Sequence, residues 1–149
     1  MVLPVLGIYA VDLPGATPET LGVALGAYGL TQAALQLPLG WLSDRIGRRP
    51  VVIGGLLLFI LGSVIAASAE TIYGIIAGRF VQGGGAIAAA LAALAADYTR
   101  DSQRTKAMAI MGVSIGMSFT LALILGPFLN NIVGVSGIFW LTAVLAIVA

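Results

Sequence analysis

Residues 40–50 read Gly-Trp-Leu-Ser-Asp-Arg-Ile-Gly-Arg-Arg-Pro, a short basic segment between two long apolar runs. The run before it, residues 20–43, contains no lysine or arginine, and residues 51–69 after it contain no charged side chain. Each run is long enough to cross the hydrocarbon core of a bilayer as a helix. A basic turn between two such runs is typical of the cytoplasmic surface of a membrane protein.

The composition of the whole chain also indicates a membrane protein. Of its 149 residues, 60% are hydrophobic and only 9% are charged, whereas a soluble domain has about a quarter charged residues. The net charge of +1 gives no electrostatic footprint for nucleic acid. The chain has no cysteine and no histidine, which removes thiol catalysts and the commonest metal ligands. We therefore expect no enzyme activity, no metal, no cofactor and no nucleic-acid partner.

The apolar runs predict an all-α protein with six membrane spans. The expected spans cover about residues 1–11, 20–43, 50–69, 72–96, 107–129 and 137–149. A full span of 20 to 25 residues is roughly 30 Å or more of helix, which matches the hydrocarbon core. The first run is too short to cross, and the last residue falls inside an apolar run. We therefore expect a truncated first span and a chain that is a fragment.

The basic residues predict the orientation of the spans. Six of the seven lie in the loops after the second and fourth expected spans, namely Arg45, Arg48, Arg49, Arg100, Arg104 and Lys106. The excess of basic residues in cytoplasmic loops places both loops in the cytoplasm. The remaining one, Arg79, lies within the fourth expected span.

The order Gly-x-Leu-x-Asp-Arg-x-Gly-Arg-Arg in residues 40–49 resembles motif A, the loop 2–3 signature of the major facilitator superfamily. Residues 2–6, 28–32 and 104–109 extend the resemblance, which is greatest to the YajR-type branch of the drug:proton antiporters. It implies a six-helix N-terminal half over residues 1–149, with the C-terminal half of the same transporter as its absent partner. Two three-helix units of inverted topology build such a half.

The resemblance also implies a conformational latch. Asp44 and Arg48 would form a charge cluster with Asp97, which ends the fourth expected span. The remaining motif positions are Gly40, Arg45, Gly47 and Arg49. The alternative is ordinary anchoring of basic loops at the membrane surface, which explains the arginines but not the aspartate and two glycines at fixed offsets.

Residues 79–83, Arg-Phe-Val-Gln-Gly, resemble motif B of proton-coupled antiporters. A charge within a span costs at least about 2.5 kcal/mol on insertion scales and usually faces a polar interior. The resemblance implies that Arg79 serves proton coupling. By helical spacing, one face of this span carries Arg79, Gln82, Gly83, Ala86 and Ala90, which suits a cavity lining or tight helix packing. The alternative is that the Arg79 side chain extends to the outer interface.

Gly126 and Pro127, in the fifth expected span, resemble the antiporter kink of motif C. Asn130-Asn131 stand where that motif has a glycine pair. This departure from the motif weakens the antiporter assignment. A simple proline kink near a helix end is the alternative.

A polar stripe, Tyr28, Gln32 and Gln36, follows one face of the second expected span. These side chains either face a substrate cavity or make hydrogen bonds to other helices. Asp12 is a further candidate proton site near the end of the first span.

The resemblance implies a secondary active transporter of the bacterial inner membrane. The expected activity is export of a small molecule against proton entry by alternating access. Its partners would be the substrate, protons and the lipid bilayer. Two alternatives stay open: a facilitator or symporter of the same superfamily, and a six-helix membrane subunit that does not transport.

Overall fold

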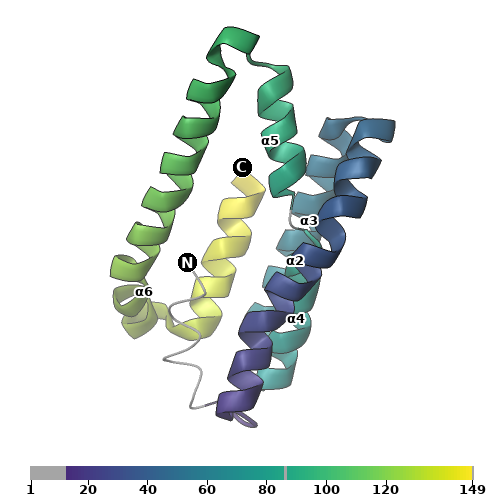
Figure 1. Ribbon diagram of the computed structural model, residues 1–149. Coiled ribbons are helices and arrows are strands. Elements are labelled where there is room, and N and C mark those ends of the chain that lie inside the picture. The colour runs from purple at the N-terminus through teal and green to yellow at the C-terminus, as the bar shows by residue number, and fades with distance from the viewer. Residues whose placement is uncertain (1–12, 86, 149) are drawn as a thin grey trace.

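The computed structural model describes residues 13–85 and 87–148, and every regular element among them is helical. In chain order these are α2 (Pro18–Ile46), α3 (Arg48–Ala67), α4 (Ile72–Gly84), α5 (Ala88–Asp97), the short 3₁₀ helix η2 (Asp101–Gln103) and α6 (Arg104–Val148) (Figure 1). The expected first span and Asp12 lie outside the described residues. The all-helical prediction agrees with this architecture.

Three helical segments are long and apolar enough to cross a membrane by length and composition. They are Arg48–Ala67, Ile72–Asp97 and Asp101–Val148. Helix α2, with 29 residues, is long enough but is not among them; it carries the Tyr28, Gln32 and Gln36 stripe. The structure therefore supports a membrane protein without fixing the number of spans at six.

Helices α2 and α3 form a hairpin with a single-residue turn. Thr17 starts α2 with a capping box in which its side chain accepts from the Thr20 backbone N–H, and Pro18 follows at the favoured first position. At the other end Gly47 has φ of +97°, a conformation open to glycine and strained for other residues. Only Gly47 separates the two helices. The residues on either side of it, which the sequence places in a loop, therefore belong to the end of α2 and the start of α3.

The fourth expected span is interrupted. Helix α4 ends at Gly84 and α5 begins at Ala88. The interruption begins within three consecutive glycines, residues 83–85, and glycine disfavours a continuous helix. A Cβ added at Gly85 would lie 2.6 Å from the backbone nitrogen of Phe59. The chain thus comes close to α3 at the point where the helix is broken.

Helix α6 consists of two arms. Gly134, with φ of +68° and ψ of −179°, is the non-helical residue between them, and the chain reverses its direction within α6 (Figure 1). We call residues 104–133 the first arm and residues 135–148 the second arm. The sequence predicts a polar turn over residues 130–137, but helical structure continues through the asparagines. One glycine with a positive φ is enough to reverse the chain.

Close backbone contacts hold α2, α3 and α4 together. A Cβ added at Gly62 would lie 2.6 Å from the carbonyl oxygen of Gly78, and one added at Gly78 would lie 2.6 Å from the Ala66 nitrogen. Small residues permit this approach in membrane helices. The second arm of α6 adds Ile138 and Phe139 to the main core cluster, whose other buried members are Ala24, Ala66, Ala67, Ile72 and Ile75.

The first arm of α6 is mostly exposed in the described structure. Phe119, Leu123 and Ile124 are exposed, whereas Ala122 and Gly126 are buried. Exposed apolar side chains on a helix of this length suit contact with lipid or another hydrophobic element. The packed part of the molecule is therefore α2–α4 with the second arm of α6.

Candidate functional site

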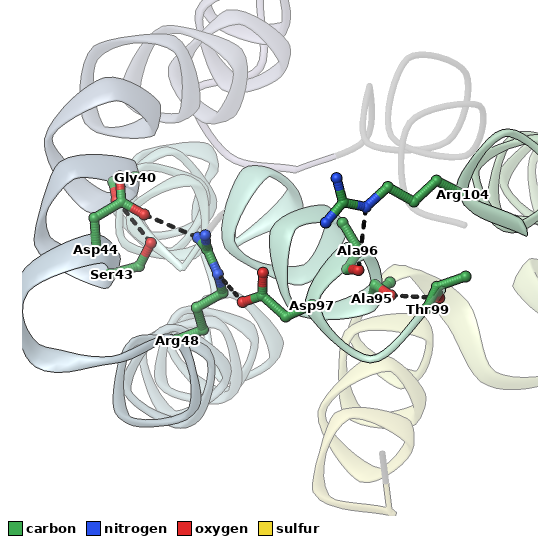
Figure 2. Close-up of polar contacts among 9 residues, drawn as sticks. All are labelled: Gly40, Ser43, Asp44, Arg48, Ala95, Ala96, Asp97, Thr99 and Arg104. Carbon is green, nitrogen blue, oxygen red and sulfur yellow. Dashed lines mark hydrogen bonds and ion pairs between the residues drawn. The ribbon is translucent and has the colours of Figure 1, made fainter. Parts of the chain in front are cut away.

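Arg48 lies between two carboxylates at one end of the helices (Figure 2). Its Nη1 is 3.0 Å from Asp44 Oδ1, and its Nε donates to Asp97 Oδ2. The Arg48 side chain is 26% exposed, and those of Asp44 and Asp97 are 64% and 50% exposed. This contact is a water-accessible charge cluster that joins α2, α3 and α5.

Local helix structure alone does not favour these charges. Arg48 is the first residue of α3 and Asp97 is the last of α5. A cation at a helix N-terminus and an anion at a C-terminus both oppose the helix dipole. Their pairing across the two helix ends offsets this, so the tertiary contact explains both residues. The Gly47 turn also brings Asp44 and Arg48 together, although they belong to different helices.

The other positions of residues 40–49 have separate contacts. The Arg45 guanidinium carbon lies 3.9 Å from the centroid of the Trp41 ring, a cation–π arrangement. Arg49 donates to the hydroxyl of Tyr98. Gly40 has no described atom within 4 Å of an added Cβ, so no close helix contact within the described chain requires a glycine at this position.

Arg79 is the centre of a second, buried polar cluster. Its side chain is 3% exposed, and Nη1 donates to Gln82 Oε1 over 2.9 Å. Gln82 Nε2 lies 2.8 Å from the Ser63 hydroxyl, which donates to the Phe59 carbonyl. The guanidinium carbon is also 4.5 Å from the centroid of the Tyr28 ring. The Arg79 side chain therefore points to neighbours on α2 and α4 rather than to an exposed helix end.

Two Arg79 nitrogens, Nε and Nη2, are buried without a hydrogen-bond acceptor in residues 13–85 and 87–148. Buried polar groups are nearly always hydrogen-bonded, and a guanidinium fork matches a carboxylate or phosphate. The arrangement can therefore accept an anionic group at these two positions.

The helical face expected around Arg79 is only partly present. Gly83 lies on it, and an added Cβ there would lie 3.0 Å from Thr31 Cβ of α2. Ala86 lies outside the described residues. Ala90 follows the break before α5 and packs in a different cluster with Val51 and Val52.

The three polar residues of α2 line two different cavities. Tyr28 and Gln32 line a pocket of about 250 Å³. Phe59 of α3 and Gly85, Ile87, Ala88 and Leu91 of the broken span also line it. Gln36 lines a larger groove of about 620 Å³ with Trp41 and Asp44. The stripe thus runs from the neighbourhood of Arg79 to the neighbourhood of Arg48.

Gly126 and Pro127 lie within the first arm of α6, where helical structure continues past the proline. Asn130 Oδ1 is buried and accepts no hydrogen bond from the described residues. The asparagine that departs from the motif C pattern therefore leaves an acceptor available on this helix.

The sequence did not single out Ser63 or Tyr98. Ser63 is fully buried at 0% exposure, and a hydroxyl in an otherwise apolar run is a signal that could have identified it. Tyr98, next to Asp97, carries no comparable signal. Among the described residues, no group of three or more carboxylates gathers as a metal site requires.

Comparison with known proteins gives consistent matches along the chain. A family model described as Major Facilitator Superfamily matches residues 1–149. The chain is 55% identical over 146 residues to "Inner membrane transport protein YajR" of Escherichia coli (strain K12), covering 98% of this chain and 32% of that protein. It is 40% identical over 148 residues to "Uncharacterized transporter BU466" of Buchnera aphidicola subsp. Acyrthosiphon pisum (strain APS), covering 99% and 38%.

A more distant relative is "Multidrug resistance protein MdtL" of Shigella dysenteriae serotype 1 (strain Sd197). It is 33% identical over 150 residues, covering 95% of this chain and 38% of that protein. The chain therefore spans about a third of the length of these relatives.

Proposed function

This chain belongs to the major facilitator superfamily, and we propose that it forms the six-helix N-terminal half of a bacterial inner-membrane transporter. The relatives are about three times as long, which leaves room for a C-terminal half. Two of these relatives are named as a transport protein and a transporter. The transporter moves a small molecule by alternating access, with the substrate cavity between the two halves.

The observation that carries this proposal is Arg48 in contact with both Asp44 and Asp97. These side chains form the latch, together with Gly47, which makes the turn. The latch stabilises the outward-facing state from the cytoplasmic side. Because all three side chains are partly exposed, the contact is weak enough to open and close during a transport cycle.

Arg79 supplies the coupling site in this proposal. Its two nitrogens without a described acceptor support binding of a carboxylate that exchanges protons, or of an anionic part of the substrate. Tyr28 and Gln32 line the adjacent cavity, and Gln36 lines the groove nearer the latch. MdtL is named a multidrug resistance protein, which supports efflux as the direction of transport.

The loops that carry Arg48 and Arg104 face the cytoplasm. Six of the seven basic residues lie in these two loops, which is the distribution that positive-inside insertion produces. YajR is named an inner membrane protein, and the same membrane is proposed here.

Accessibility of a single cysteine tests alternating access without a known substrate. The 149 residues contain no cysteine, so Gln32→Cys is a unique label site in the proposed cavity once any cysteine elsewhere in the full-length transporter is replaced. We expect a membrane-impermeant maleimide to react there from the outer side. Adding Asp44→Asn should increase reaction from the cytoplasmic side.

Leu57→Cys is the matched control, because Leu57 is an exposed apolar residue of α3 and is expected to face lipid. It should react from neither side. If Gln32→Cys reacts from one side only, whatever the state of Asp44, alternating access is rejected.

A facilitator or symporter of the same superfamily is the second candidate. Asn130-Asn131 in place of the motif C glycine pair favours it. A pH-sensitive dye inside proteoliposomes distinguishes the mechanisms. When substrate leaves the vesicle, an antiporter brings protons in and a symporter carries protons out with the substrate. A facilitator leaves the internal pH unchanged. A non-transporting subunit would fail the cysteine test above.

A further inference from the structure

A second contact joins the same two helix ends as the Arg48–Asp97 ion pair. Arg49 Nη2 donates to the Tyr98 hydroxyl, and the Arg49 guanidinium carbon is 5.6 Å from the centroid of the Tyr98 ring. Arg48 and Arg49 are the first two residues of α3, whereas Asp97 ends α5 and Tyr98 is its C-cap. Two adjacent residues of one helix therefore contact two adjacent residues of the other.

The helix dipoles explain why Arg49 is placed here. A cation is unfavourable at the N-terminus of its own helix, α3, and favourable at the C-terminus of a neighbouring helix. Arg49 contacts the C-cap of α5, where the last carbonyl groups have no intrahelical donor. Its position is thus favoured by α5 rather than by α3.

The two contacts respond differently to charge. The Arg48–Asp97 contact needs an ionised carboxylate, and Arg48 is shared with Asp44. The Arg49–Tyr98 contact combines a cation with a neutral phenol and an aromatic face. Neutralising Asp97 should therefore weaken the first contact, because the charge attraction is lost, and should leave the second contact unchanged.

Packing in the hydrophobic core does not explain the position of Tyr98. Its side chain is 69% exposed, and it belongs to neither buried cluster. A large aromatic residue in this position is explained by what it contacts at the helix end, namely Arg49.

We propose that Arg49 and Tyr98 are positioning residues that keep the end of α5 against the start of α3 while the Arg48–Asp97 ion pair is open. Asp97 then stays close to Arg48, so that the ion pair between them can form again without a large movement of α5. This inference rests on the proposed latch function of Arg48.

Distances between two spin labels test the proposal in the full-length protein. Ile46→Cys places a label on the exposed last residue of α2, and Ser102→Cys places one on an exposed residue of η2, after α5. The 149 residues contain no other cysteine, and any cysteine elsewhere in the full-length protein is replaced first. With Asp97→Asn alone, the short distance should persist because Arg49 still contacts Tyr98. Adding Tyr98→Leu should lower the ratio of short to long distances about two- to fivefold.

Three further variants give the controls. Tyr98→Leu alone should keep the short distance, because the ion pair remains. In the Asp97→Asn background, Tyr98→Phe retains the ring and should keep part of the short population. In that background Arg100→Gln should have no effect, since Arg100 is exposed and its side chain makes no described hydrogen bond or ion pair.

The proposal is overturned if Asp97→Asn alone releases the end of α5, or if the double variant keeps the short distance. Release in Tyr98→Leu alone would also overturn it. A different measurement tests the latch itself. If Asp97→Asn leaves the sidedness of Gln32→Cys labelling unchanged, the latch proposal fails, whatever the spin-label distances show.

Discussion

Arg48 and Arg79 lie in opposite surroundings within the same protein. Arg48 is partly exposed at a helix end and contacts two carboxylates. Arg79 is buried inside the helix bundle and contacts the neutral side chains of Gln82 and Tyr28. The exposed cation has opposite charges beside it, and the buried cation has none among the described residues.

This difference indicates two kinds of role. A water-accessible ion pair is worth little net free energy, because solvent replaces each lost contact and salt screens the charges. It can therefore open and close repeatedly. A buried cation without a counterion is costly and usually functional. Arg79 is thus suited to attract a charged group, and Arg48 to a reversible contact between helices.

Replacing Arg79 should have the largest effect. We expect Arg79→Ala to abolish proton-driven substrate flux in proteoliposomes, because it removes the charge that binds or tunes the exchanging group. Arg79→Lys keeps the charge but not the planar fork, so its flux should be reduced or absent. Expression should stay near normal for both variants.

Arg100→Ala is the matched control, since it removes an exposed arginine and should leave the flux intact. Wild-type flux in Arg79→Ala between about pH 6 and 8, a range outside the titration of arginine, would show that Arg79 is not the coupling residue. The difference in burial between Arg79 and Arg48 would then not reflect a difference in function.

Adding one methyl group between α3 and α4 should have the next largest effect. A Cβ at Gly78 would lie 2.6 Å from the Ala66 nitrogen and 2.7 Å from its Cβ, so Gly78→Ala forces apart the helices that carry Ser63 and Gln82. We expect a loss of about 1–3 kcal/mol in the free energy of unfolding, measured by denaturant titration in mixed micelles.

Gly112→Ala is the control for this prediction. Gly112 lies on the first arm of α6, and no atom of residues 13–85 and 87–148 lies within 4 Å of a Cβ added there. Alanine should be neutral or stabilising there because of its higher helix propensity. Equal effects at the two glycines would contradict the close packing of α3 on α4.

A conservative change at Arg48 should have a smaller effect. Arg48 uses Nη1 for Asp44 and Nε for Asp97, and the single ammonium of lysine cannot reproduce this fork. Arg48→Lys should shift the ratio of outward- to inward-facing protein about two- to fivefold, as expected for exposed pairs. Sidedness of Gln32→Cys labelling reports the shift, and an unchanged ratio would count against the latch.

The smallest expected effect is that of salt. Raising the ionic strength from about 0.1 M to about 1 M shortens the Debye length from about 10 Å to about 3 Å. The Arg48 contacts should weaken, with a change of about twofold in the labelling ratio. The Arg79 to Gln82 contact is buried and should not respond. Sucrose at matched osmolality controls for water activity, and the same response in Arg48→Gln would exclude Arg48 as the source.

Much of this picture was predictable from local sequence. The basic segment at residues 40–50 between apolar runs predicts the hairpin of α2 and α3, and its residue order predicts the superfamily, which the comparisons confirm. The single-residue turn at Gly47 and the helix broken between Gly84 and Ala88 are finer than the apolar pattern can resolve. Runs of hydrophobic residues define lengths, while backbone angles at individual glycines depend on neighbouring helices.

The sequence alone determined the chemical class of the protein, because a low charge content and long apolar runs can only be accommodated in a bilayer. It also determined which polar residues are exceptional, since any charge in such a chain needs a reason. Only the tertiary structure decided their partners: Arg48 with Asp97, Arg49 with Tyr98, and Arg79 with Gln82 and Tyr28. Contacts between distant positions depend on how closely helices approach. That approach is fixed where Gly62 meets Gly78 and Gly83 meets α2, which no local pattern specifies.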